Sequence, residues 1–435
     1  MSLSVLPLKL EVVKASGTVH IRADGSVDPS LSSLATADNI TYTFTEDITG
    51  SFLIERSNIV VDGKGYTLLG SEGSCGFNLS SVNNVAIRNT NITGFDYGIR
   101  LCNSSDNSVF GNNLATNHHC GIELSDSSNS NRISGNNMTN SDGEGILLED
   151  SGGNSIIGNI ITLNMDSGVL LLGSSNRNSI FGNNITANKF AGIMLFAYSG
   201  SNSICRNNIR SNGEGIGLSS SNNSVSGNNI TSNGEGIAVF GPGNSILGNN
   251  ITANNGAMRL LDSTSHNNVS QNIITANKYW GIKLDPNSFS NHIYHNDFGQ
   301  YNPDGHQVDA AGYNNSFDLG YPSGGNYWSD YNSTDLFSGP YQNETGRDGI
   351  GDTPYTVTDN NTDYYPLMQP YNGKSFEADL NKDGAVNILD IFIVATAYGS
   401  KPGDPNWNAI TDLDNNGAIN ILDIFIIARD YGKTV

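Results

Sequence analysis

The chain has 435 residues, with 42 acidic and 21 basic side chains and a formal net charge of −21. A chain this acidic is poorly suited to nucleic acid or an anionic membrane surface, but it can hold cations. Its length fits one elongated domain followed by a small one, and it contains no apolar run long enough to span a bilayer.

The N-terminal residues 1–15 are mildly apolar and resemble the remnant of a clipped secretion signal. The low lysine content and the many uncharged polar residues also favour a secreted or cell-surface protein. Four cysteines, Cys75, Cys102, Cys120 and Cys205, are irregularly spaced and show no metal-binding pattern. We expect them to be buried fillers or to form one disulfide.

Residues 16–56 contain two short strand-type segments around a loop rich in Ser and Asp. We interpret this range as an N-terminal cap, because the first coil of a solenoid otherwise exposes an unpaired strand edge.

Residues 57–298 repeat one short unit, most clearly between Asn107 and Asn296, with 21 to 24 residues from one start to the next. Each unit has an apolar residue two positions after its starting Asn, a second Asn at five and another apolar residue at seven. A Gly-Ile-x-Leu phrase closes most units. The starting residues are Asn107, Asn131, Asn154, Asn178, Asn202, Asn223, Asn244, Asn267 and Asn291.

A repeat of this length indicates a solenoid, either a leucine-rich repeat or a parallel β-helix. The apolar positions alternate in short clusters between Gly, Asn and Ser, which favours short strands and tight turns. Runs of helix formers are almost absent. We therefore predict a mainly β protein, a parallel β-helix of about eleven coils in which equivalent residues stack about 4.8 Å apart.

The asparagine columns predict the corners of each coil. Asn tolerates a left-handed backbone, and its amide can hydrogen-bond the next Asn in the column. A further column predicts another corner, at Asn164, Asn188, Asn212, Asn233, Asn254 and Asn277.

After Phe298 the period fails, and residues 299–374 form a predicted C-terminal cap and linker rich in Tyr, Asn, Gly and Asp. Its bulky aromatics are expected to cover the last coil. Asp348 and Asp352 either hold a cation or form an ordinary Gly-Asp turn.

The repeat block, its Asn-Asn-Ile-Thr phrases, the opening at residues 21–25 and the aromatic segment around Trp328 together resemble secreted proteins of the NosD-like kind. The resemblance covers roughly residues 16–370. It implies a right-handed parallel β-helix, a fold shared with carbohydrate-binding proteins and sugar hydrolases.

Two loops near the C-terminus have calcium-ligand spacing, D-x-N-x-D-G-x-x-N-x-x-D and a close copy of it. Side chains at positions 1, 3, 5, 9 and 12 and the carbonyl at position 7 supply the oxygens that calcium prefers, and Gly at position 6 permits the sharp turn. We predict two calcium ions, one in each loop. The predicted ligands are Asp379, Asn381, Asp383, Ala385, Asn387 and Asp390, then Asp412, Asp414, Asn416, Ala418, Asn420 and Asp423.

Each loop leads into an apolar, helix-like segment, residues 388–398 and 421–431, and neither loop has a helix before it. This duplicated half-motif, over residues 375–435, resembles a type I dockerin, which implies calcium-dependent docking onto a cohesin module. In that family the residues at loop positions 10 and 11 help to select the partner. Here they are Ile388, Leu389, Ile421 and Leu422, so the predicted partner surface is apolar, and it either docks onto a partner or packs against the protein's own body.

Catalysis by the β-helix would need two carboxylates across a groove. Glu214 and Glu235 occupy the same position in successive units and should stack, which would perturb their protonation; they are weak catalytic candidates. Arg259 and Lys283 share another column without an obvious acidic cluster beside them. The pairs His118-His119 and His292/His295 offer few ligands for copper.

Two functions therefore remain open. One is a non-catalytic surface or matrix protein whose rod touches polysaccharide through Tyr279 and Trp280 and whose dockerin binds a cohesin or another copy. Head-to-tail binding of copies would form a filament. The other is a carbohydrate-active hydrolase or lyase that its dockerin delivers to a complex.

Overall fold

The computed structural model describes residues 17–196, 198–261, 263–299, 306–358, 360–371, 378–381, 386–402, 404, 406–413 and 417–431. The chain divides into two units, Met1–Asn178 and Ser179–Val435. The expected secretion-signal remnant and four predicted calcium ligands, Asp383, Ala385, Asp414 and Asn416, lie outside the described residues.

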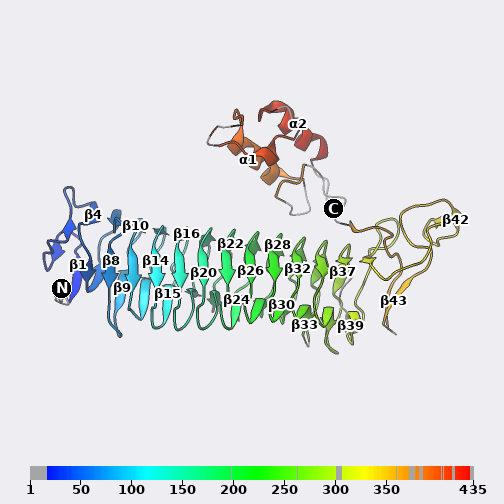
Figure 1. Ribbon diagram of the computed structural model, residues 1–435, viewed down its shortest axis with the longest axis horizontal. Coiled ribbons are helices and arrows are strands. Elements are labelled where there is room, and N and C mark those ends of the chain that lie inside the picture. Colours follow the sequence, from blue (N-terminus) through cyan, green and yellow to red (C-terminus); the bar gives the residue numbers. More distant parts are fainter. Residues whose placement is uncertain are drawn as a thin grey trace, which may run out of the picture. The chain divides into compact units, whose positions relative to one another are not determined.

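In the first unit the chain coils through three sheets in turn, and each coil adds one short strand to each sheet (Figure 1). Sheet A contains β2 (Val27–Asp28), β1 (Thr18–Ile21), β6 (Ser51–Ile54), β9 (Cys75–Ser80), β12 (Tyr97–Cys102), β15 (Cys120–Ser125), β18 (Ile146–Glu149) and β21 (Val169–Leu172). Sheet B contains β3 (Leu34–Ala35), β4 (Thr41–Phe44), β7 (Ile59–Asp62), β10 (Val85–Arg88), β13 (Ser108–Phe110), β16 (Arg132–Ser134) and β19 (Ser155–Ile157). Sheet C contains β5 (Ile48–Thr49), β8 (Thr67–Leu69), β11 (Asn91–Thr93), β14 (Asn113–Ala115), β17 (Asn137–Thr139) and β20 (Ile160–Thr162).

The second unit repeats this arrangement with its own strands. Its sheet A contains β24 (Ala191–Leu195), β27 (Glu214–Leu218), β30 (Glu235–Val239), β33 (Gly256–Leu260), β36 (Trp280–Leu284) and β39 (His306–Ala310). Its sheet B contains β22 (Ser179–Phe181), β25 (Ser203–Cys205), β28 (Ser224–Ser226), β31 (Ser245–Leu247), β34 (Asn268–Ser270) and β37 (His292–Tyr294). Its sheet C contains β23 (Asn184–Thr186), β26 (Asn208–Arg210), β29 (Asn229–Thr231), β32 (Asn250–Thr252), β35 (Ile273–Thr275), β38 (Asp297–Phe298) and β40 (Tyr327–Trp328).

These coils form the predicted parallel β-helix, with about 11 turns. Regular coiling begins earlier and ends later than the expected cap boundaries. β1, β4 and β5 already pair in parallel with β6, β7 and β8, so among the residues described from 17 onward the N-terminal edge is closed by β2 and β3, which pair antiparallel. β39 and β40 extend sheets A and C beyond residue 298.

The core consists of columns of apolar side chains that stack from coil to coil. Ile204, Val225 and Ile246 pair in register in sheet B and are fully buried. Full burial of such a side chain contributes roughly 1.5–3 kcal/mol, so each coil is stabilised mainly by its two neighbours.

The predicted asparagine columns are buried hydrogen-bond ladders at the three corners. The Asn228 side chain donates to the Ile204 carbonyl at 2.9 Å and to Asn249 Oδ1 at 2.9 Å, and its own Oδ1 accepts the Asn207 backbone N–H at 2.9 Å. Each side chain thus satisfies backbone groups that the corner would otherwise bury unpaired.

The left-handed residue at these corners is the one before each buried Asn, contrary to our expectation for Asn itself. Gly227 has φ +60° and Arg206 has φ +56°, directly before Asn228 and Asn207. The turn is made one residue earlier so that the following Asn can point inward and bond along the ladder.

Aromatic rings cover the last coil, as the composition predicts. The buried Trp328 ring stacks on Phe298 at 4.4 Å and on Tyr355 at 4.4 Å. Trp328 Nε1 donates to the buried Asp363 carboxylate at 2.8 Å. The remaining strands of this region form two hairpins, β41 (Phe337–Ser338) with β42 (Glu344–Thr345), and β43 (Tyr355–Thr358) with β44 (Asn361–Asp363).

The C-terminal module has two α-helices, α1 (Ile388–Ala397) and α2 (Ile421–Asp430), and a 3₁₀ turn, η2 (Ala409–Thr411). They enclose a small apolar core that includes Val386, Val394, Ile419 and Ile427. None of the helices in the described part of the chain is long and apolar enough to cross a membrane. All four cysteines are free, which favours the filler interpretation.

Candidate functional site

The two helices of the C-terminal module begin at the end of each predicted calcium loop, and the loop carboxylates fix their first turns. The fully buried Asp390 carboxylate accepts backbone N–H groups of Leu380 at 2.8 Å, Asn381 at 3.1 Å and Asn387 at 2.9 Å. In the second loop Asp423, also fully buried, accepts the N–H of Leu413 at 2.7 Å.

Asn387 and Asn420, at loop position 9, are the N-caps of α1 and α2. Their side chains accept the N–H groups of Leu389 and Leu422, both at 2.8 Å, and Asp390 and Asp423 complete capping boxes. The loop spacing therefore also places Asn387 and Asn420 at the helix N-caps, whereas from the sequence we interpret them only as calcium ligands.

The described part of these loops fits a calcium ion chemically. Each loop holds a fully buried carboxylate, Asp390 in the first and Asp423 in the second. An ionised carboxylate offers about four lone-pair positions, so Asp390 retains capacity after its three N–H contacts. Hard oxygen donors of this kind suit calcium rather than a softer metal.

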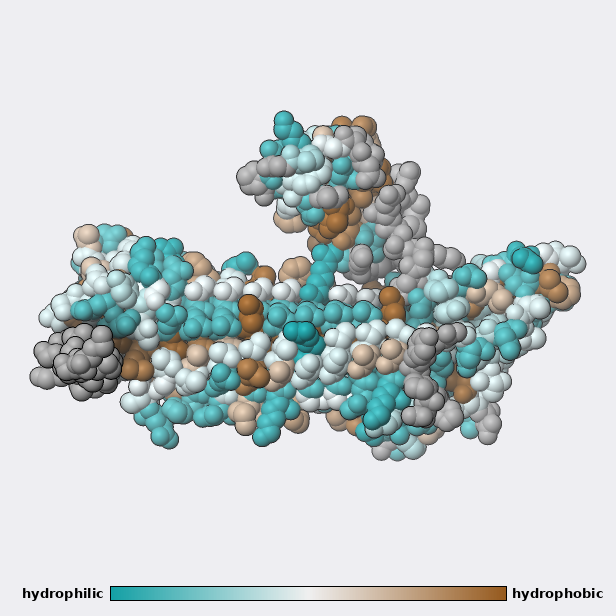
Figure 2. Space-filling view, viewed as in Figure 1, coloured by the Kyte–Doolittle hydropathy of each residue, from teal (hydrophilic) through white to brown (hydrophobic). Residues whose placement is uncertain are grey.

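Apolar side chains that the small core does not bury lie on both helices. Ile388, Leu389 and Phe392 of α1 are 61%, 55% and 67% exposed, and the equivalent Ile421, Leu422 and Phe425 of α2 are similarly exposed. We call these six residues the apolar strip. Figure 2 shows hydrophobic atoms on this module, in contrast to the mostly hydrophilic strands. Phe392 and Phe425 lie one helical turn after Ile388 and Ile421, so the helical period places them beside these residues.

A second cluster lies on the outer face of sheet A in the second unit. Glu214 of β27 and Glu235 of β30 are direct partners in the parallel register, as the repeat predicts. Gly217 leaves room for the Glu214 carboxyl and for Met194, since a Cβ there would lie 2.5 Å from Glu214 Oε1 and 2.4 Å from the Met194 sulfur. The Glu214 carboxyl therefore lies against the sheet, over Gly217.

The environment of these glutamates opposes their ionisation. Burial, together with the nearby charge of Glu235, raises the pKa of Glu214 to about 7. Burial also raises the pKa of Glu235 to about 7, against the opposing effect of Arg259. Glu214 Oε1 and Glu235 Oε1 are buried without a hydrogen-bond partner in the described part of the chain. Two such carboxyls can share protons near neutral pH.

An aromatic ring and two ion pairs continue this surface. The Trp280 ring lies over Gly256, the register partner of Glu235, because a Cβ on Gly256 would meet the ring at 2.4 Å. The Tyr279 ring lies 5.8 Å from it. Arg259 pairs with Asp285 at 2.8 Å and Lys283 with Asp309 at 3.3 Å, so acidic residues do accompany this basic column, contrary to our expectation. We call Glu214, Glu235, Arg259, Trp280 and Lys283 the Glu–Trp face.

Asp352 forms a turn. Its carboxylate accepts the backbone N–H groups of Leu336 and Phe337 at 3.0 and 2.9 Å and the Thr334 hydroxyl at 2.8 Å. These hydrogen bonds lower the pKa of Asp352 below its ordinary value, against the raising effect of burial. Asp348 caps its own turn by accepting the Ile350 N–H at 3.0 Å.

Comparison with known families gives two matches. Residues 32–211 and 185–333 match the NosD family, described as a periplasmic copper-binding protein. The chain belongs to the NosD family. Residues 377–430 match the dockerin type I domain. Dockerin type I domains bind calcium and dock onto cohesin modules, which is consistent with assembly at the cell surface.

No curated protein matches this NosD-family chain significantly. Among solved structures it is similar to the A-module of mannuronan C-5 epimerase AlgE6 from Azotobacter vinelandii, with a TM-score of 0.48, 15% identity and coverage of 63% of this chain and 88% of that chain. It is also similar to DFA-IIIase from Arthrobacter chlorophenolicus A6, with a TM-score of 0.43, 17% identity and coverage of 60% of this chain and 69% of that chain.

The described residues of this NosD-family member do not fit a copper centre. They contain no group of three or more His, Cys, Asp or Glu placed to hold a metal ion. His295 Nε2 lies 2.9 Å from the Ser323 carbonyl and its ring stacks on Tyr371, while His118 pairs with Asp142 at 3.4 Å and His119 stacks on Tyr97. Three of the four histidines considered for copper, His118, His119 and His295, therefore contact other groups, and we derive no copper chemistry.

Proposed function

We propose that this NosD-family protein is an extracellular or cell-surface component whose β-helix is attached through its calcium-loaded dockerin. The observation that carries the proposal is the apolar strip, which is repeated on both helices and is too exposed to belong to the module's own core. Exposed apolar patches of this kind mark interaction surfaces.

Two calcium ions, one in each loop, complete the proposed attachment module. The twelve loop residues predicted from the sequence are the proposed ligands, with Asp390 and Asp423 each joining a loop to its helix. Binding should then couple directly to folding of this small module. Calorimetric titration of chelator-treated protein should find two calcium ions per chain; one ion or none would refute this part.

The proposed partner is a cohesin module or a second copy of this chain. Immobilised cohesin modules, with calcium or with EGTA, test the first, and light scattering of the purified chain tests the second. Phe392→Asp with Phe425→Asp should abolish whichever association calcium supports, while Tyr364→Asp, at an exposed aromatic of the cap, should leave it unchanged. Association that persists in EGTA would show that the calcium-loaded dockerin does not mediate it.

We propose further that the Glu–Trp face contacts a polysaccharide. Trp280 supplies an apolar ring beside two carboxyls with unpartnered oxygens, a combination suited to stacking on a sugar and hydrogen-bonding its hydroxyls. Pull-down on insoluble polysaccharides should show binding that Trp280→Ala weakens.

A second candidate, sugar hydrolysis at the same face, is favoured by the stacked glutamates. Strands in adjacent coils lie about 4.8 Å apart, near the roughly 5 Å carboxyl separation of retaining glycosidases. At a pKa of about 7, one carboxyl can be the proton donor while the other is ionised. A reducing-sugar assay on a polysaccharide panel decides this: turnover that Glu214→Gln removes would make the protein an enzyme, and no turnover would leave it a binding protein.

A further inference from the structure

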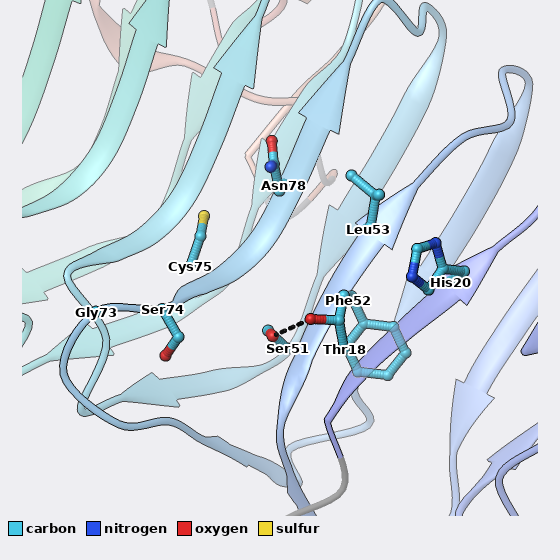
Figure 3. A pocket seen from close by; sticks show the side chains of 9 residues that line it. All are labelled: Thr18, His20, Ser51, Phe52, Leu53, Gly73, Ser74, Cys75 and Asn78. Atoms are coloured by element: carbon cyan, nitrogen blue, oxygen red, sulfur yellow. Dashed lines mark hydrogen bonds between the residues drawn. The ribbon is translucent and has the colours of Figure 1, made fainter. Parts of the chain in front are cut away.

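The outer face of sheet A in the first unit carries an open hollow of about 450 Å³ (Figure 3). β1, β6 and β9 form its floor, and its polar lining is mostly uncharged. The lining residues are Thr18, His20, Ser51, Phe52, Leu53, Gly73, Ser74, Cys75 and Asn78.

Beyond the hollow lies an aromatic pair, with Tyr97 on the next strand, β12, and His119 directly before β15. Its last residues, Cys75 and Asn78 of β9, are the register partners of Tyr97 and Arg100 of β12. The Tyr97 ring stacks on His119 with centroids 4.8 Å apart and an interplanar angle of 21°, and the Arg100 guanidinium lies 5.2 Å from the Tyr97 centroid. Two flat rings therefore border the hollow on the side of β12.

Beyond the rings lie two buried carboxyls with different surroundings. Glu123 of β15 pairs with Arg100 at 2.5 Å, so its charge is compensated. Glu144, next to Cys120 and directly before β18, is only 9% exposed, and its Oε2 has no hydrogen-bond partner in the described part of the chain. A buried polar atom left without a partner costs about 1–3 kcal/mol, so a ligand that bonds to it is favoured.

We propose that the outer face of sheet A from β1 to β18 binds a neutral sugar chain, which stacks on the Tyr97–His119 pair and receives a hydrogen bond from Glu144. Six strands at about 4.8 Å give this face a length of roughly 24 Å, enough for several sugar rings. The site lies in the first unit and is additional to the Glu–Trp face.

The groups on this face favour a neutral sugar over an anion or a metal. Arg100 is already paired with Glu123, and the net charge of −21 repels a polyanion. No metal-binding group of His, Cys, Asp and Glu occurs among the described residues. Burial raises the pKa of Glu144 above its ordinary value, and the negative charges of Asp166 and Glu123 add to this effect while His119 opposes it. The raised pKa favours the protonated carboxyl, which can donate a hydrogen bond.

The test is calorimetric titration of the full chain in calcium with neutral hexasaccharides of glucose, mannose and N-acetylglucosamine, and with an oligogalacturonate as the acidic counterpart. At least one neutral hexasaccharide should bind. Tyr97→Ala and Glu144→Ala should each weaken binding about tenfold, while Tyr97→Phe and Glu144→Gln, which keep the ring and a donor, should retain most of it. Circular dichroism should verify that each variant is folded.

The pH dependence and a control variant complete the design. Binding to the wild-type chain should weaken as pH rises and Glu144 ionises, and Glu144→Gln should remove that dependence. Because Trp280→Ala removes the contribution of the proposed Glu–Trp face, the titrations are repeated in that background, where a neutral hexasaccharide should still bind and Tyr97→Ala should still weaken its binding. The inference is overturned if only oligogalacturonate binds, if no neutral hexasaccharide binds, or if Trp280→Ala rather than Tyr97→Ala removes binding. The last result would leave the proposed function of the Glu–Trp face intact.

Discussion

Replacing Glu214 and Glu235 by Gln should change how the stability of the solenoid depends on pH. In the folded chain both carboxyls have a pKa of about 7, whereas the ordinary value is 4.5. Because folding raises these pKa values, the native state holds protons that the unfolded chain releases. The associated stability is fully present below about pH 4.5 and is lost as pH rises through about 7.

The size of this pH-dependent change in stability follows from the same pKa values. One pKa unit corresponds to about 1.4 kcal/mol, so the gap between 4.5 and about 7 is worth about 3 kcal/mol for each carboxyl. The two titrate as a pair, since the charge of Glu235 contributes to the raised pKa of Glu214. Removing both charges should therefore stabilise the chain by several kcal/mol at pH 8 and have little effect at pH 4.5.

Urea unfolding followed by circular dichroism, in calcium and across this pH range, measures the effect. The free energy of unfolding of the wild-type chain should fall relative to Glu214→Gln/Glu235→Gln as pH rises, with the change centred between 4.5 and 7. Glu149→Gln, at an exposed strand position, is the control and should follow the wild type. Parallel pH profiles for the wild type and the double variant would refute the buried, proton-holding pair.

Three further predictions concern the ladders and the dockerin. Asn228→Ala should destabilise the solenoid by about 3–5 kcal/mol in urea unfolding, because it leaves buried backbone groups unpaired. The control Asn229→Ala, at an exposed position whose side chain bonds to surface side chains, should cost less than about 1 kcal/mol. Equal losses in the two variants would contradict the stabilising role of the ladder. Chelation of calcium should expose residues 378–431 to limited proteolysis while the strands stay protected; an unchanged fragment pattern would show that the module folds without metal. Phe392→Asp should leave the free energy of unfolding within about 0.5 kcal/mol, because its side chain is largely exposed, and a larger loss would mean that it belongs to the module's core.

Most of the architecture was predictable because the same residue types recur at the same positions of every coil. The columns from Asn107 and Asn112 fixed the register, and the structure keeps both columns, with Val109 and Leu114 buried beside them. The backbone of the corner was not predictable from Asn alone. Its left-handed residue varies from Gly227 to Arg206, since the ladder's hydrogen bonds impose the turn on whatever residue precedes it.

The candidate sites were predictable only in part. The stacking of Glu214 on Glu235 follows from spacing, but the burial of Glu214 depends on Gly217 and Met194 in neighbouring positions, which a single unit does not reveal. Tyr97 and Glu144 lie two coils apart at the same repeat position, directly before the Gly-Ile phrase, but their residue types differ, so no motif joined them. The partners of Arg259 were missed because Asp285 follows the strand of the next coil.

The ladders also determine how the length of this protein can change. Asn207, Asn228 and Asn249 make equivalent bonds at intervals of 21 residues. Excising 21 residues from Asn228 onward would let Asn207 meet Asn249 with the same donors and acceptors, whereas deleting one residue within a strand would move the following side chains of that strand to the opposite face. The β-helix can therefore be shortened or lengthened by whole coils, and each coil changes its length by one strand spacing of about 4.8 Å.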